Sequence, residues 1–166
     1  MTAVPAGEVP DVRKAVEVEA TPEEAFDVFA QRPLEWWPAH HVFVTDRRSI
    51  TIEPVFGGRY YETGADGTTI DWGTVVEWDR PRRLVLTWRM GPGWRPVYDD
   101  ALASLIEVDV TPTGPGTCEV ALTHARLDRH GEIAPGIHAA LQGPSPGPTL
   151  EQYAEVVARR VPPRAA

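Results

Sequence analysis

The residue whose surroundings best suit chemistry is His124, near the end of an alternating apolar stretch. Residues 105–111 and 117–125 are predicted to form a β-hairpin. The face of this hairpin that carries Val108 and Val120 continues to His124, which lies opposite Ser104. An imidazole on such a face orients a ligand or accepts a proton near neutral pH. A hydrogen-bonded histidine without a chemical role is the alternative. The sequence alone therefore identifies no catalytic residue, and His124 is the candidate.

Aromatic side chains are the second group of interest, because the chain has six Trp against four Phe and four Tyr. A Trp carries a large apolar ring and one N–H donor, which suits the wall of a ligand site as well as a core. The sequence does not decide between these two interpretations. The residues expected to bind a ligand are Trp36, Trp37, Tyr61, Trp72, Trp88, Trp94, Tyr98 and His124.

Other ionisable residues give weaker signals. His40 and His41 are adjacent, and neighbours on an extended segment point in opposite directions, so they are poor partners for one metal ion. Cys118 lies on the apolar side of its strand and is expected to be a small buried hydrophobe. The chain has no zinc-protease, nucleophile-elbow, phosphate-loop or dinucleotide motif. We therefore expect no metal and no cofactor.

Composition narrows the class of protein. A net charge of −8 opposes binding to nucleic acid, and no segment has the roughly 18 apolar residues of a membrane span. One cysteine and the lack of a signal-peptide pattern favour the cytoplasm. Lys14 is the only Lys beside many Arg, Pro and Gly, which is typical of a GC-rich bacterial genome.

The elements that must position these residues follow from local patterns. Thr21 and Glu24 form a capping box with Pro22 at the first helical position, which predicts a helix that Pro33 ends and a short second piece over 34–37. A second capping box at Thr149 predicts a C-terminal amphipathic helix. Strands are predicted over 12–19, 49–55, 59–63, 70–78, 84–90, 105–111 and 117–125, and 129–148 is expected to be a long loop or a broken helix.

This order, one strand, short helices, six strands and a helix, is typical of an α+β domain with an antiparallel sheet. We expect a flexible tail over 1–10, a single domain over 11–161 and a C-terminal tail over 162–166. In the long hairpin, the simplest register places Ile106, Val108 and Val110 on one face with Leu122, Val120 and Cys118.

Several short motifs, taken in order, resemble one known family. They are Thr21-Pro22-Glu23-Glu24-Ala25-Phe26, Trp36-Trp37-Pro38, Gly57-Gly58-Arg59-Tyr60-Tyr61-Glu62, Asp71-Trp72-Gly73-Thr74 through Trp78, Pro81-Arg82-Arg83-Leu84, and Leu122-Thr123-His124. Together they are similar to the START-like (SRPBCC) superfamily, in the branch named for activators of the ninety-kilodalton heat-shock protein's ATPase. The resemblance implies a helix-grip fold, a curved sheet wrapped around the C-terminal helix with a cavity between them.

The resemblance leaves three functions open, because relatives include lipid carriers, polyketide cyclases and co-chaperones. The first is a carrier or sensor that binds a small hydrophobic molecule. The second is an enzyme of cyclase, aromatase or hydrolase type that acts on such a molecule. The third is a protein that interacts with a chaperone, and a homodimer is a further alternative because sheet edges invite association.

Overall fold

The structure is a computed structural model, and it describes residues 9–36, 47–91, 95–96, 99, 102–142 and 148–161. Its elements, in chain order, are β1 (Val12–Val18), α1 (Pro22–Gln31), α2 (Pro33–Trp36), β2 (Arg47–Ile52), β3 (Arg59–Gly64), β4 (Thr69–Asp79), β5 (Arg83–Trp88), β6 (Met90–Gly91), β7 (Arg95–Pro96), β8 (Ser104–Gly114), β9 (Thr117–Ala125), the 3-10 helix η4 (Leu127–Ile133), α3 (Ala134–Gln142) and α4 (Pro148–Arg160). The fold is α+β, as predicted.

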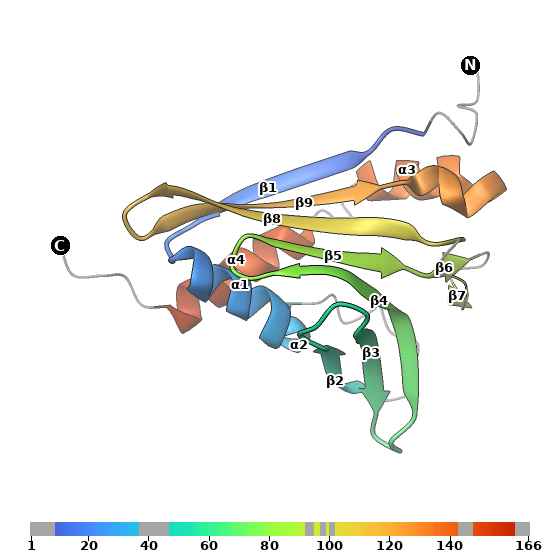
Figure 1. Cartoon of the computed structure of the whole chain (residues 1–166), viewed down its shortest axis with the longest axis horizontal. Helices are drawn as coiled ribbons and strands as arrows, with labels where there is room; N and C mark the ends of the chain where they lie inside the picture. Colours follow the sequence, from blue (N-terminus) through green and yellow to red (C-terminus); the bar gives the residue numbers. More distant parts are fainter. Residues whose placement is uncertain are drawn as a thin grey trace.

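Seven antiparallel strands form one sheet in the order β1-β9-β8-β5-β4-β3-β2. The sheet is strongly curved. In Figure 1, β2 and β3 run almost at right angles to β1, β9, β8 and β5, and the long strand β4 bends from one direction to the other. This half-barrel is the predicted helix-grip architecture.

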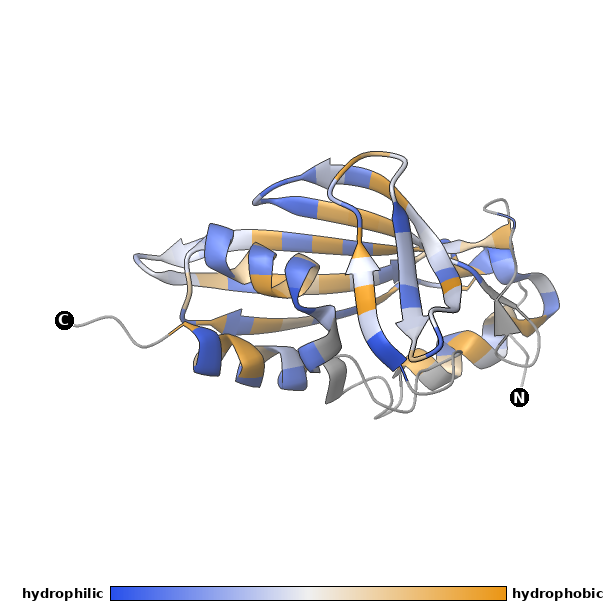
Figure 2. Cartoon of the chain, turned by 90° about the horizontal axis from the view of Figure 1, so that it is seen from below, coloured by the Kyte–Doolittle hydropathy of each residue, from blue (hydrophilic) through white to orange (hydrophobic). Residues whose placement is uncertain are grey.

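The helices cover one face of this sheet, which we call the inner face. Figure 2 shows α3 and α4 on the same side of the strands, at opposite ends of the molecule, and α4 packs against both β1 and α1. The inner face carries Leu84, Leu86, Ile106, Val108 and Val110 in register. Apolar and polar residues alternate along most of the strands because the inner face is buried (Figure 2), whereas β5, at the centre of the sheet, also buries Val85 and Thr87 of the opposite face.

Local sequence explains where α1 begins. The Thr21 hydroxyl accepts from the Glu24 amide at 3.2 Å, and the Glu24 carboxylate accepts from the Thr21 amide at 3.0 Å. Pro22 occupies the first turn, where a missing N–H costs nothing. The predicted capping box is thus confirmed.

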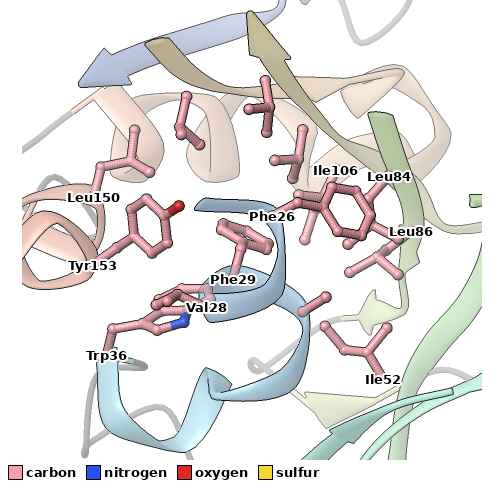
Figure 3. Close-up of a cluster of buried hydrophobic side chains, with 14 of the residues drawn as sticks. Phe26, Val28, Phe29, Trp36, Ile52, Leu84, Leu86, Ile106, Leu150 and Tyr153 are labelled. Atoms are coloured by element: carbon pink, nitrogen blue, oxygen red, sulfur yellow. The ribbon is translucent and has the colours of Figure 1, made fainter. Parts of the chain in front are cut away.

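The core lies between the helices and the inner face. Phe26 of α1 packs among Leu84, Leu86 and Ile106, while Phe29, Trp36 and Tyr153 form an aromatic group farther along the helices (Figure 3). The Tyr153 hydroxyl donates to the Ala25 carbonyl at 2.6 Å. Because Ala25 is in α1 and Tyr153 in α4, this bond fixes one helix against the other.

Two predicted boundaries need correction. The strand expected to reach Val55 ends at Ile52, because the chain turns there at Pro54 and through Gly57, whose φ is +81°. The C-terminal helix starts at Pro148, so Thr149 lies within its first turn and is not the N-cap.

The segment expected as a long loop or a broken helix contains η4 and α3, with a kink at Gly131.

The long hairpin has the predicted face but a different pairing. His124 pairs with Ile106 and not with Ser104, and Val108 pairs with Leu122. The strands continue to Gly114 and Thr117 around a tight turn with an irregularity after Pro112, and the partners are two residues away from the predicted ones. Since side chains alternate with period two, this slip keeps every residue on its predicted face.

A close contact at Gly73 marks the bend of β4. A Cβ on Gly73 would lie 1.9 Å from the Thr87 carbonyl oxygen, so only glycine lets β4 approach β5 so closely. At the same place the Thr87 hydroxyl accepts from the Thr74 amide at 2.8 Å. The side chain of Thr87 therefore supplies one hydrogen bond where the regular ladder is interrupted.

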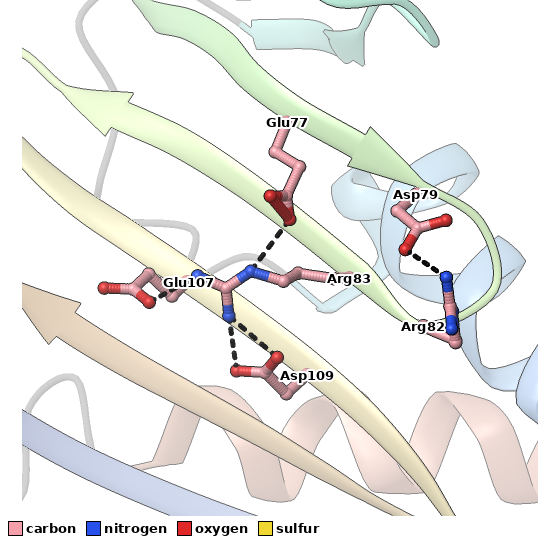
Figure 4. Close-up of polar contacts among 6 residues, drawn as sticks. All are labelled: Glu77, Asp79, Arg82, Arg83, Glu107 and Asp109. Atoms are coloured by element: carbon pink, nitrogen blue, oxygen red, sulfur yellow. Dashed lines mark hydrogen bonds and ion pairs between the residues drawn. The ribbon is translucent and has the colours of Figure 1, made fainter.

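The opposite face of the sheet, the outer face, carries charges. Arg83 on β5 contacts three carboxylates, those of Glu77, Glu107 and Asp109, at 2.6–2.8 Å (Figure 4). These hydrogen bonds, first to Glu107 and then to Asp109, raise the pKa of the guanidinium further above its ordinary value. Glu107 thus faces outward.

Candidate functional site

A group of polar and aromatic side chains lies on the inner face where β5, β8 and β9 meet η4. We call Trp88, Ser104, His124 and His130 the histidine cluster. The rings of Trp88 and His124 lie edge to face with centroids 5.4 Å apart, and Trp88 meets His130 in the same way at 5.7 Å. Trp88 thus separates two imidazoles on the inner face.

The strand pairing explains why three of these residues meet. Trp88 pairs with Ser104, and His124 pairs with Ile106, so all three side chains point from neighbouring strands to the same face. The fourth residue, His130, follows the turn after β9. Arg126 adopts a left-handed conformation with φ 58° and ψ 38°, which is uncommon outside glycine, and η4 then brings His130 back over β8.

His130 and Ser104 are hydrogen bonded, with 2.8 Å between Nε2 and Oγ. Ser104 is fully buried. This is the distance at which an imidazole exchanges a proton with a hydroxyl, and which of the two donates depends on the imidazole tautomer. Arg129, the neighbour of His130, donates to the Ala103 carbonyl at 3.4 Å, which holds η4 against the start of β8.

His124 is the most perturbed ionisable group of the cluster. It is only 8% exposed, and its Nδ1 has no hydrogen-bond partner among the described residues. Burial, with smaller contributions from the charges of Lys14 and His130, lowers its pKa from 6.5 to about 4. His124 is therefore neutral at pH near 7, with one ring nitrogen available to a ligand.

A second polar group lies on the inner face at the other end of the sheet. The Arg47 guanidinium and the Glu62 carboxylate are 3.5 Å apart, with side chains 8% and 0% exposed. Glu62 is next to Tyr60 on the same face of β3, and the Tyr60 ring meets that of Trp72 with centroids 5.9 Å apart. Burial raises the pKa of the Tyr60 hydroxyl well above its ordinary value.

One predicted site residue, Tyr61, lies away from the inner face. Tyr61 points to the outer face, where the Arg59 guanidinium lies 4.1 Å from the centre of its ring and also binds Asp71. Tyr60 takes the inward position, because it pairs with Ile52 and Gly73 on the inner face. Adjacent residues on a strand point to opposite faces, and the sequence alone did not determine which of the two tyrosines is inside.

The remaining predicted residues fall into three groups. Trp88 and His124 are brought together in the histidine cluster, and Trp72 lies farther along the sheet against Tyr60. Trp36 is buried in the helix core between Phe29 and Tyr153. Trp37, Trp94, Tyr98, His40 and His41 lie outside the described residues.

Sequence reasoning did not single out His130, Tyr60, Arg47 or Glu62, and it placed Ser104 on the face of His124 without giving it a role. Only Glu62 carried a usable signal, since a charged residue in a strand position that alternates with buried ones is unusual. The other contacts join residues that are far apart in the chain, such as Ser104 and His130.

Metal binding finds no support in the described part of the chain, where no three His, Cys, Asp or Glu side chains gather around a common point. Cys118 is buried, and burial raises the pKa of its thiol to about 11. A thiol of this kind stays protonated near neutral pH and is a poor ligand or nucleophile. None of the described helices is long and apolar enough to span a membrane.

The histidine cluster can therefore move protons in surroundings of low polarity. The neutral His124 accepts a proton or binds a hydroxyl, and the Ser104–His130 pair receives or returns one. Trp88 lies beside both imidazoles and offers a flat apolar surface. Such a set suits an aromatic ligand whose oxygen atoms lose and gain protons.

Comparison with known proteins gives a family and several solved structures. The family model described as "Activator of Hsp90 ATPase homolog 1-like protein" matches residues 19–143. No curated protein matches the chain.

Among solved structures, an anthrahydroquino-gamma-pyrone synthase, Txn09, complexed with a ligand abbreviated SUM, is 52% identical. The match covers 92% of this chain and 99% of that one, with a TM-score of 0.62. The self-sacrificing resistance protein CalC from Micromonospora echinospora is 25% identical over 94% of this chain and 99% of its own, with a TM-score of 0.64. A protein from Arthrobacter aurescens shares the fold at 17% identity, with coverages of 92% and 88% and a TM-score of 0.63.

Proposed function

This chain belongs to the family of Activator of Hsp90 ATPase homolog 1-like proteins, and from that premise we propose that it binds an aromatic polyketide and closes a γ-pyrone ring on it. The observation that carries the proposal is the 52% identity with an anthrahydroquino-gamma-pyrone synthase, over 92% of this chain. The buried imidazoles beside Trp88 support it, because ring closure of this kind requires proton transfer in a dry site.

The chemistry needs few groups. A γ-pyrone fused to an arene forms when an aryl hydroxyl attacks the far carbonyl carbon of a β-diketone side chain on the neighbouring ring carbon. A C–O bond forms, and the oxygen of that carbonyl leaves as water with the aryl proton and one proton of the carbon between the ketones. The enzyme must therefore accept one proton from the attacking hydroxyl and one from the carbon between the ketones, and donate two to the departing oxygen.

We assign proton acceptance to His124 and proton donation to the Ser104–His130 pair. Neutral His124, with a free Nδ1, is in the protonation state that accepts a proton. The hydrogen bond between Ser104 Oγ and His130 Nε2, at 2.8 Å, links the hydroxyl to a group that resupplies its proton. Trp88 orients the flat ligand through its ring.

The test uses an aryl β-diketone with a hydroxyl beside the side chain, on a reduced anthraquinone, and follows the loss of one water by mass spectrometry. We expect His124→Gln to lower kcat about 100-fold while the affinity for the substrate changes little, because a general base acts mainly in the transition state. Tyr61→Phe, on the outer face, is the matched control and should leave kcat unchanged.

The outcomes separate the enzyme from the carrier. Turnover that depends on His124 supports the proposal. Binding of the substrate without any turnover by the unchanged protein contradicts it and favours a carrier, a function in line with the relative described as a self-sacrificing resistance protein. Binding to a chaperone and formation of a homodimer both stay predictions.

A further inference from the structure

The ion pair of Arg47 and Glu62 lies on the same inner face as the histidine cluster, but at the opposite end of the sheet. Its neighbours along these two strands, among the described residues, include apolar and aromatic side chains. Ile50 pairs with Glu62, and Ile52 pairs with Tyr60. β2 is the edge strand, so the pair lies on the two strands nearest to the rim of the sheet.

A register shift turns Arg47 inward. Between Arg47 and Ser49 the pairing with β3 shifts by one residue, and Arg47 pairs with Gly64 while Ser49 pairs with Thr63. Without the shift, an odd-numbered residue of β2 would point outward, since Ile50 and Ile52 point inward. Bulges of this kind often redirect a side chain beside a binding site.

A second shift lies close by. Tyr60 pairs with Gly73 and Tyr61 with Asp71, which leaves Trp72 as the extra residue of β4. Its ring lies against Tyr60, at a tilt of 40°. Tyr60 therefore lies between the charged pair and Trp72, and both irregularities of the pairing occur in this part of the sheet.

Stability alone is a weak reason for this arrangement. Moving both charges out of water is costly, and apolar residues of similar size in place of a buried pair are often neutral or stabilising. The nearest nitrogen and oxygen are 3.5 Å apart, at the long end of hydrogen-bond distances, so the contact between them is loose.

We propose that Arg47 and Glu62 bind the polar edge of the aromatic ligand, where a hydroxyl stands beside a carbonyl. The Glu62 carboxylate accepts from the ligand hydroxyl, and the Arg47 guanidinium donates to the carbonyl oxygen. An Arg beside a Glu offers a donor next to an acceptor, which is the complement of that edge. Trp72 and Tyr60 then contact the ring to which these oxygens are attached. This inference rests on the proposed function, because it assumes an aromatic ligand.

The test compares two probes by quenching of tryptophan fluorescence: a hydroxyanthraquinone with its hydroxyl beside the carbonyl, and the parent anthraquinone without it. We expect the unchanged protein to bind the hydroxylated probe about tenfold more tightly. The variant Arg47→Met with Glu62→Leu should bind both probes equally. The matched control, Arg59→Met with Asp71→Leu, removes an ion pair of the same kind from the outer face of β3 and β4 and should keep the preference.

Circular dichroism and thermal unfolding establish that each variant is folded, and Glu62→Gln, close to Glu in shape, replaces the double variant if that one does not fold. A preference that survives in the Arg47 and Glu62 variants overturns the inference, since the pair is then structural. If the unchanged protein binds both probes equally, the inference fails and the proposed function stands. If it binds neither probe, both fail.

Discussion

At the scale of single residues, His124 is informative because its burial and its possible chemistry conflict. A histidine in contact with Trp88, with its pKa lowered to about 4, stays neutral over the whole physiological range of pH. Neutrality provides an acceptor nitrogen, but so low a pKa also makes a weak base. Contact with a ligand hydroxyl that becomes negatively charged in the transition state would raise the pKa, which is the direction that catalysis requires.

The lowered pKa of His124 makes the stability of the folded protein depend on pH. The unfolded chain binds a proton at His124 around pH 6.5, whereas the folded chain does so only around pH 4. Stability is therefore complete above the first value and decreases as the pH falls toward the second. We expect His124 to account for a loss of about 2 kcal/mol in the free energy of unfolding between about pH 7.5 and about pH 5.

Urea unfolding at the two pH values measures this loss, and His124→Gln provides the comparison, since glutamine does not titrate. The variant should lose about 2 kcal/mol less than the unchanged protein over the same interval. Equal losses in both proteins would mean that His124 is protonated in the folded state as readily as in the unfolded chain.

At the scale of elements, α4 is joined to α1 by one buried hydrogen bond, from Tyr153 to the Ala25 carbonyl. Burial raises the pKa of this hydroxyl above its ordinary value. Tyr153→Phe keeps the ring contacts with Phe29 and Trp36 and removes only this bond. We expect the free energy of unfolding to fall by about 1 kcal/mol. Thermal unfolding measures this loss of stability, with Tyr61→Phe as the control. If Tyr153→Phe loses no more stability than Tyr61→Phe, ring packing alone holds α4 in place.

The outer face gives a second prediction at this scale. Arg83 is in contact with three carboxylates, whereas its neighbour Arg82 contacts only Asp79 at the end of β4 (Figure 4). Arg83→Met leaves Glu77, Glu107 and Asp109 facing one another across neighbouring strands. We expect this to cost about 1–2 kcal/mol near pH 7, and less in acid, where carboxylates are protonated.

Arg82→Met is the control, because an exposed single pair contributes little, at most about 0.5 kcal/mol. Denaturant unfolding of both variants, at low and high salt, distinguishes them. If the two lose the same stability at low salt, the three contacts of Arg83 add nothing beyond one surface pair.

At the scale of the whole molecule, the curvature of the sheet brings the two polar groups onto one concave side. The bend of β4 depends on Gly73, where a Cβ would lie 1.9 Å from the Thr87 carbonyl oxygen. We expect Gly73→Ala to lower the free energy of unfolding by about 3 kcal/mol. The added Cβ is fixed to the backbone of β4, and the oxygen that it would meet belongs to the backbone of β5, so neither can move away easily.

Gly136 is the matched position, since nothing lies within 4 Å of a Cβ placed there, in α3. Gly136→Ala should raise stability by about 0.5–1 kcal/mol, through the better helix propensity of alanine. If this account is right, thermal unfolding shows a lower stability for Gly73→Ala and a higher stability for Gly136→Ala. A mild effect of Gly73→Ala would mean that β4 and β5 can separate without loss of the fold.

The sequence by itself determined whatever depends on neighbours in the chain. The capping box of Thr21 and Glu24 and the alternation of β1, β8 and β9 are local, because a few consecutive residues satisfy their own hydrogen bonds or repeat with period two. Alternation also placed His124 on the inner face, even though its partner was predicted two residues away.

Only the tertiary structure decided which side chains meet. Tyr60 rather than Tyr61 points inward because of how β3 pairs with β2 and β4, and Arg47 joins Glu62 because of a shift in that pairing. His130 reaches Ser104 through a turn at Arg126 and a helix that packs against β8. Each contact depends on strand register and chain direction, which are set by the packing of the whole inner face against the helices and not by any local pattern.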